Sequence, residues 1–174
     1  AAMRIDESCV QRALPPRART AHKGHFGHVL IVGSGLGMPG AVRLAGEACL
    51  RVGAGLVTVA TRPEYVASVV AGCPELMVRG VHSAEDLAPS LEQADVIAIG
   101  PGLGQDAWAL ELWSAVLSTN KPLIVDADAL NLLALHPQRR DHWVLTPHPG
   151  EAARLLASNT CLLYTSDAAD DTPC

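Results

Sequence analysis

Aromatic side chains are scarce in this sequence, at 3% of 174 residues. Basic runs are missing too, because Lys and Arg are spread along a chain whose formal net charge is −5. Proteins that bind nucleic acid need cationic side chains against phosphates and aromatic rings on which bases stack. The composition therefore predicts no nucleic-acid partner.

Membrane and disulfide signals are also lacking. No apolar run reaches the roughly 18 residues of a membrane-spanning helix, and the opening residues AAMRIDESCVQR lack the layout of a signal peptide. The five cysteines contain no CxxC pair and are odd in number, which argues against a zinc site and a disulfide framework. We expect a cytoplasmic protein with reduced thiols and no membrane partner.

What the sequence does contain is an alternation of short apolar runs and helical patterns. The apolar runs cover residues 28–33, 56–60, 75–80, 95–100, 123–127 and 142–146. Strands that alternate with helices form right-handed βαβ units and hence a parallel sheet. We expect an α/β fold, with a mainly parallel sheet and helices on both faces. The helix after the first strand should bury a stripe of small and apolar residues: Ala41, Leu44, Ala45, Ala48, Cys49 and Val52.

Four strand-to-helix turns should meet at the carboxyl edge of that sheet, where open α/β sheets bind ligands. They cover residues 33–40, 100–104, 126–128 and 146–150. Two of them, GSGLGMPG and GPGLG, are glycine-rich and let backbone N–H groups approach an anion. The sequence therefore predicts a phosphorylated ligand at this edge.

Polar side chains at the same turns are candidates for the site, and each also has a purely structural interpretation. Asp126 ends its strand and favours a pocket role, whereas Asp128 stands where a helix N-cap is expected, so capping and binding are equally supported. His148 lies between two prolines in a turn, where its side chain has no place in the hydrophobic core, and this favours a role in ligand binding. Glu151 suits the first turn of a helix with or without a ligand.

Two other motifs favour different sites. The segment Gly35–Gly40 fits the dinucleotide fingerprint G-x-G-x-x-G, and Arg62 could meet a 2′-phosphate. However, Gly33 and Ser34 separate this motif from its strand, and Pro39 interrupts it. The evenly spaced His22, His25 and His28 have no acid beside them, so we assign no metal ligand.

Five motifs in order resemble the ADP-dependent NAD(P)H-hydrate dehydratases, which have a ribokinase-like fold. They are HKGHFGHVLIVGSGLGMPGA, LRVGAGLVTVAT, IGPGLG, PLIVDADALNLLA and VLTPHPGEAARLL, and they cover residues 14–157. The leader LPPRARTAHKG resembles the junction that follows an NAD(P)H-hydrate epimerase domain in bifunctional members. A ribokinase-like hydroxymethylpyrimidine or thiazole kinase and a Rossmann-type NADP-binding domain stay as alternatives.

The resemblance implies a hydro-lyase that repairs hydrated NADH or NADPH, with ADP (or ATP) as phosphoryl donor and Mg²⁺ as cofactor. It places four residues against the hydrate, three more in the same pocket and one near a phosphate. These are, in turn, Ala41, Gly102, Gly104 and His148; Asp126, Asp128 and Asn131; and Lys23. It also implies a fused or separate epimerase partner and a homo-oligomer at full length.

The resemblance stops abruptly after Leu156. We therefore expect a leader or linker over residues 1–20, a partial dehydratase domain over residues 21–158, and a non-native, disordered tail over residues 159–174. The family's nucleotide loops and catalytic aspartate are expected beyond this point, so the catalytic residue is unknown. The chain as written should then be inactive, with a sheet that is incomplete at the C-terminal end and an unpaired edge that promotes aggregation.

Overall fold

Six parallel strands form one sheet in the computed structural model, which describes residues 6–14 and 16–156. The strands are β1 (His28–Val32), β2 (Leu56–Thr61), β3 (Met77–Gly80), β4 (Val96–Ile99), β5 (Leu123–Val125) and β6 (Trp143–Leu145). Their order in the sheet is β3-β2-β1-β4-β5-β6. The six predicted strands and the parallel α/β fold are confirmed.

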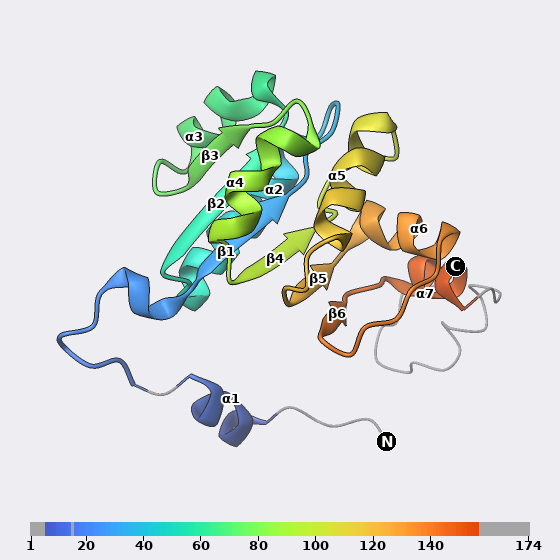
Figure 1. The fold of residues 1–174 in the computed structure, drawn as a ribbon. Helices are drawn as coiled ribbons and strands as arrows, with labels where there is room; N and C mark the ends of the chain where they lie inside the picture. The colour runs from blue at the N-terminus through green and yellow to red at the C-terminus, as the bar shows by residue number, and fades with distance from the viewer. Residues whose placement is uncertain (1–5, 15, 157–174) are drawn as a thin grey trace, which may run out of the picture.

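Helices cover the sheet on two faces (Figure 1). The α-helices are α1 (Glu7–Ala13), α2 (Pro39–Val52), α3 (Val66–Gly72), α4 (Ala84–Gln93), α5 (Ala107–Leu117), α6 (Ala127–Leu135) and α7 (Pro149–Leu155), and the 3-10 helices are η1 (Lys23–Phe26) and η2 (Pro63–Tyr65). Strand side chains alternate between the faces. Leu30 and Val32 therefore pack with α4, α5 and α6, whereas Ile31 packs with α2 and α3.

The predicted inner stripe of α2 is wrong in part. Leu44 and Val52 are 64% and 71% exposed, Ala48 is exposed as well, and the buried positions of the helix are Val42 and Gly46. A Cβ at Gly46 would lie 2.7 Å from the Leu76 side chain, so this glycine lets α2 pack against Leu76. Close packing at Gly46 therefore sets which face of the helix turns inward.

Helix α1 lies ahead of the sheet, and three of the five cysteines lie among the described residues. Helix α1 buries no residue, and Cys9, Cys49 and Cys73 are free thiols. Burial raises the pKa of the Cys49 thiol. No helix in the described part of the chain is long and apolar enough to cross a membrane. The predicted tail at residues 159–174 lies outside the described residues.

Strand β6 lies at one edge of the sheet and, among the described residues, pairs only with β5. Its side chains Val144 and Leu145 are 57% and 42% exposed. An unpaired strand edge with apolar side chains invites pairing with another strand. The edge that the sequence predicts is therefore present in the described sheet.

Candidate functional site at the carboxyl edge of the sheet

The two glycine-rich loops are joined by backbone hydrogen bonds. The N–H of Ser34 donates to the Pro101 carbonyl at 3.0 Å, and the N–H of Gly35 donates to the Gly102 carbonyl at 2.6 Å. These loops follow β1 and β4, which are neighbours in the sheet although two strands separate them in the sequence. Strands β1 to β3 are added toward one edge of the sheet and β4 to β6 toward the other, so the strand order switches between β1 and β4. Open α/β sheets form their ligand-binding crevice at such a switch point.

Glycine allows the close approaches that hold these loops in place. Gly100 has φ 128°, and a Cβ there would overlap the carbonyl oxygen of Asp126. Gly102 has φ 59°, and its Cβ would lie 3.0 Å from the Cβ of Met38 and 3.1 Å from that of Ala41. Two predicted site residues, Ala41 and Gly102, are therefore adjacent in the structure.

Asp128 holds the second glycine loop. Its Oδ2 accepts a hydrogen bond from the N–H of Gly104 at 2.8 Å, and both residues are half-buried. The capping interpretation of Asp128 is wrong, because Asp126 occupies the N-cap position of α6 and Asp128 lies in the first turn. The strand is shorter than its apolar run suggests, so the helix begins two residues earlier than expected.

Asp126 contacts a residue that the sequence analysis missed. Its side chain makes no cap hydrogen bond, and its Oδ1 instead accepts the hydroxyl proton of Thr146 at 2.7 Å. Thr146 directly follows β6, so its place at a strand end was the available signal. This contact joins the turn after β5 to the turn after β6.

His148 caps its own helix. It is the N-cap of α7, its Nδ1 accepts the N–H of Gly150 at 2.9 Å, and its backbone N–H donates to Glu151 Oε2 at 2.9 Å. The Nε2 of the ring lies 3.2 Å from Glu151 Oε1. The carboxylate of Glu151 is buried and holds the imidazole, whose ring is largely exposed.

Asn131 faces α7. Its Oδ1 accepts a hydrogen bond from the Nε of Arg154 at 2.8 Å. Both residues, with Gln105, Ala134 and Leu135, line a hollow of about 590 Å³ beside the loop that follows β4. Arg154 was not predicted as a site residue, and it brings a cation to this end of the edge.

The N-termini of the helices at this edge differ in how they are capped. Asp106 and His148 cap α5 and α7 with their side chains, whereas Met38 and Asp126, at α2 and α6, make no side-chain cap hydrogen bond. The first N–H groups of a helix have no acceptor within it. At α6 the carboxylates of Asp126 and Asp128 offset the positive helix end. At α2 Pro39 has no N–H and the N–H of Ala41 donates to the Met38 carbonyl at 3.4 Å, so the N–H of Gly40 is the donor left for an anion.

Backbone strain lies in the same turns. Ser34 and Ala127 are the non-glycine residues with positive φ in the described part of the chain, at 57° and 46°. Ser34 is fully buried, and its hydroxyl donates to the Met38 carbonyl at 2.7 Å. Non-glycine residues in this conformation concentrate at functional sites, since the surrounding structure must hold them there.

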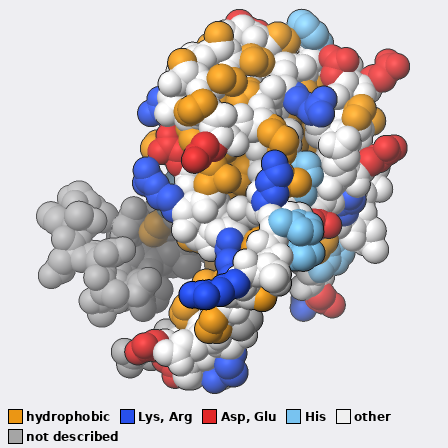
Figure 2. Space-filling view, turned by 90° about the vertical axis from the view of Figure 1, so that its left-hand side faces the viewer, with side chains coloured by type: hydrophobic (Ala, Val, Ile, Leu, Met, Phe, Trp, Pro, Cys, Tyr) orange, Lys and Arg blue, Asp and Glu red, His pale blue; other side chains and the backbone are white. Residues whose placement is uncertain are grey.

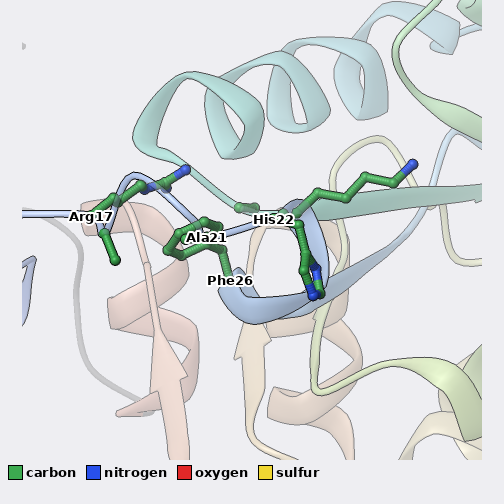
Figure 3. A pocket seen from close by; sticks show the side chains of 8 residues that line it. Arg17, Ala21, His22 and Phe26 are labelled. Carbon is green, nitrogen blue, oxygen red and sulfur yellow. The ribbon is translucent and has the colours of Figure 1, made fainter.

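Lys23 is not brought together with the other candidates. It begins η1, ahead of β1, and therefore lies at the amino edge of the sheet. There it lines a separate pocket of about 370 Å³ with Arg17, His22 and Phe26. Figure 3 shows Arg17 and Phe26 together in this pocket, where the guanidinium lies 3.7 Å from the ring centroid.

The neighbouring histidines form no metal site in the structure. His22 and His25 stack at 3.7 Å, whereas His28 contacts the Thr58 hydroxyl at 2.7 Å. Across residues 6–14 and 16–156, no three His, Cys, Asp or Glu side chains are grouped to hold a metal ion. Basic and histidine side chains nevertheless gather on the face that Figure 2 shows, near the leader.

Comparison with known proteins agrees with this architecture. The family profile described as NAD(P)H-hydrate dehydratase matches residues 29–170. A bifunctional NAD(P)H-hydrate repair enzyme of Coxiella burnetii is 60% identical over 143 residues, which are 82% of this chain and 29% of that protein. An ADP-dependent (S)-NAD(P)H-hydrate dehydratase of Streptococcus thermophilus is 43% identical over 88% of this chain and 57% of its own length.

Solved structures show the same fold. The Bacillus subtilis ADP/ATP-dependent NAD(P)H-hydrate dehydratase, co-crystallised with ATP/Mg²⁺, superposes with a TM-score of 0.76 at 30% identity, over 92% of this chain and 58% of that one. A ribokinase-like protein of Enterococcus faecalis gives 0.76 at 36% identity, over 83% and 53%. These relatives do not favour the kinase or Rossmann alternatives. With a matching profile over most of its length, the chain belongs to the NAD(P)H-hydrate dehydratase family.

Proposed function

We propose that this chain supplies the hydrate-binding edge of an ADP-dependent NAD(P)H-hydrate dehydratase, a hydro-lyase of nicotinamide nucleotide repair. The observation that carries the proposal is the row of interlocked turns after β1, β4, β5 and β6 in a chain of this family. The chain spans 29% and 57% of the relatives described above. The activity of a whole protein is therefore part of the proposal.

The size of the edge suits a dinucleotide. Between β2 and β6 lie three other strands, so the edge from β2 to β6 extends roughly 19 Å at about 4.8 Å per strand. The N–H of Gly40, at the start of α2, would bind the pyrophosphate. Ala41 and Gly102 pack closely against each other at that point, while His148 and Asn131 lie toward the other end.

The reaction needs a phosphoryl donor. The hydroxyl of the hydrate attacks the terminal phosphate of ADP (or ATP), the nucleotide leaves with one phosphate fewer, and elimination of phosphate restores the double bond of NADH or NADPH. The ATP/Mg²⁺ in the Bacillus subtilis crystals supports such a donor. The described residues group no three metal ligands, so we assign no residue and no step to Mg²⁺, and the catalytic residue stays unassigned.

The test measures binding and turnover separately. The chain and a version extended by the rest of the family domain would be titrated with NADH hydrate and NADPH hydrate, and ADP-dependent recovery of absorbance at 340 nm would report turnover. Ala41→Leu should weaken hydrate binding at least tenfold, by filling the start of α2. Ala48→Leu, on the same helix but exposed, is the matched control.

The expected result is hydrate binding by both proteins and turnover by the extended one. Absence of binding in both, or equal effects of the two leucine variants, would refute the proposal. An epimerase partner, either fused or separate, and a homo-oligomeric state at full length belong to the same proposal; sedimentation of the extended protein with and without the epimerase tests them.

A further inference from the structure

The first glycine loop, residues 33–40, has a fixed base and an exposed tip. At its base, the N–H groups of Ser34 and Gly35 donate to the loop that follows β4. At its end, the carbonyl of Met38 accepts the hydroxyl proton of Ser34 at 2.7 Å. The tip between them consists of Leu36, which is 66% exposed, and Gly37, where nothing lies within 4 Å of a Cβ. The base is therefore packed, whereas the tip is exposed.

One hydrogen bond joins this tip to another element. The N–H of Gly37 donates to the hydroxyl oxygen of Tyr65 at 2.8 Å. In the described part of the chain, it is the one hydrogen bond from Leu36 or Gly37 to a residue outside the loop. Gly37 has φ 88°, and a glycine adopts other conformations readily when nothing holds it. The Tyr65 hydroxyl is therefore the anchor of the tip.

Tyr65 is suited to this role because its own backbone is fixed. It ends η2, where its N–H donates to the Arg62 carbonyl at 3.0 Å and its carbonyl accepts the Ser68 hydroxyl proton at 2.8 Å. The helix η2 lies against β3, since a Cβ at Gly80 would lie 2.8 Å from the Cα of Pro63. The Tyr65 hydroxyl thus links a well-packed part of the fold to the exposed tip.

The tip leads directly into the start of α2. Gly37 precedes Met38, the N-cap of that helix, and lies three residues before Gly40. The N–H of Gly40 is the donor that this helix end offers to an anion. The position of Gly37 therefore influences how that N–H is presented at the candidate edge.

We propose that Tyr65 is a positioning residue, whose hydroxyl holds the first glycine loop in the conformation that receives the pyrophosphate of the hydrate. This inference rests on the proposed function and adds a residue that acts through the loop. A loop that is ordered before its ligand arrives loses less conformational entropy on binding. The anchor therefore acts on the dissociation constant of the hydrate rather than on the chemical step.

The alternative is that Tyr65 only stabilises the fold. The hydrogen bond between η2 and the loop would then contribute to the free energy of unfolding, and its loss would leave hydrate binding unchanged. A positioning role appears instead in the exchange of the Gly37 amide and in the dissociation constant.

The first experiment compares the unmodified chain with Tyr65→Phe, which removes the hydroxyl and keeps the ring. Hydrogen exchange at the Gly37 amide should accelerate about fivefold, as expected for the loss of one neutral hydrogen bond. Calorimetric titration with NADH hydrate and NADPH hydrate should give dissociation constants about fivefold higher for both. In the extended protein, the KM for the hydrate should rise by about the same factor while kcat stays within about twofold.

Ser118→Ala is the matched control. It also removes one exposed hydroxyl, but Ser118 is the C-cap of α5 and therefore lies at the amino edge of the sheet. It should change neither the exchange of Gly37 nor the binding of either hydrate. Urea unfolding of both variants shows whether the loss of a hydroxyl acts through global stability.

A double-mutant cycle tests whether Tyr65 acts through the tip. Gly37→Ala has room for its Cβ but disfavours φ 88°, so it should also weaken hydrate binding about fivefold. Because both changes release the same tip, the double variant should bind hydrate about as weakly as either single variant. Effects that multiply would show that the two residues act independently, and would overturn the proposal.

The other outcomes are distinguishable. If Tyr65→Phe leaves the exchange of Gly37 or the binding of hydrate unchanged, or acts no differently from Ser118→Ala, the positioning role is overturned and the proposed function stands. If the unmodified and extended chains bind neither hydrate, the proposed function and this inference both fall.

Discussion

Gly100 and Gly104 belong to one loop but meet different surroundings. Both have positive φ, at 128° and 79°. A Cβ at Gly100 would overlap the Asp126 carbonyl, whereas nothing lies within 4 Å of a Cβ at Gly104. The motif GPGLG indicates that both are turn residues. Their spatial neighbours show that Gly100 is required for lack of space, whereas Gly104 is required only for its positive φ.

This difference gives a stability prediction. Gly100→Ala should lower the free energy of unfolding by about 3 kcal/mol or more, because the turns after β4 and β5 must move apart. Gly104→Ala should cost about 1 kcal/mol, the price of a left-handed alanine. Urea denaturation followed by circular dichroism measures both, and equal costs would contradict the packing described here.

Asp128 offers a second test with single residues. Asp128→Ala removes the acceptor of the Gly104 N–H, a charge-assisted bond worth roughly 1–2 kcal/mol when half-buried. Hydrogen exchange at the Gly104 amide should then accelerate about tenfold. Asp141→Ala is the control, because Asp141 is 93% exposed and pairs only with Arg139 among the described residues. Unchanged exchange at Gly104 would show that Asp128 does not hold the loop.

Among the elements, α7 begins with a capping residue that is also a candidate site residue. Its cap uses the Nδ1 and backbone N–H of His148, and the buried Glu151 completes the capping box. The imidazole is still largely exposed at the candidate edge. The sequence analysis assigned no structural role to the His148 imidazole, whereas in the structure its Nδ1 caps α7.

A pair of substitutions separates the capping role of His148 from its proposed binding role. His148→Asn keeps a good N-cap and should change the free energy of unfolding by less than about 0.5 kcal/mol, whereas His148→Ala should cost about 1 kcal/mol. If the ring also contacts the hydrate, both variants should bind it about tenfold more weakly. Titration with the hydrate tests the binding role. Unchanged binding by His148→Asn would show that His148 only caps the helix.

At the scale of the whole molecule, the sheet has one edge that invites association. Val144 lies in the middle of β6, is 57% exposed, and has no neighbouring strand on its outer side among the described residues. Exposed apolar edges pair with further strands, and natural proteins protect them with charged side chains.

Val144→Lys should therefore reduce self-association. Analytical ultracentrifugation at several concentrations should show a smaller aggregated fraction than for the unmodified chain. Val52→Lys is the matched control, because Val52 is 71% exposed but lies on α2, away from the edge. An equal reduction by both variants would point to net charge rather than edge pairing.

Much of the architecture was determined by the sequence alone. The apolar runs and helical patterns located six strands and the helices between them, because the periodicity of burial is a local property. The convergence of four turns followed from parallel topology. Even the separation of Lys23 could have been predicted, since a residue ahead of a strand lies at the amino edge.

Only the tertiary structure decided which groups meet. The pairs Gly104–Asp128, Asp126–Thr146 and Arg62–Asp106 join residues 24, 20 and 44 positions apart, and the inward face of α2 depends on Leu76. Such contacts follow from strand order and close packing, which no local pattern encodes. The sequence thus located the candidate edge, and long-range packing determined which side chains meet there.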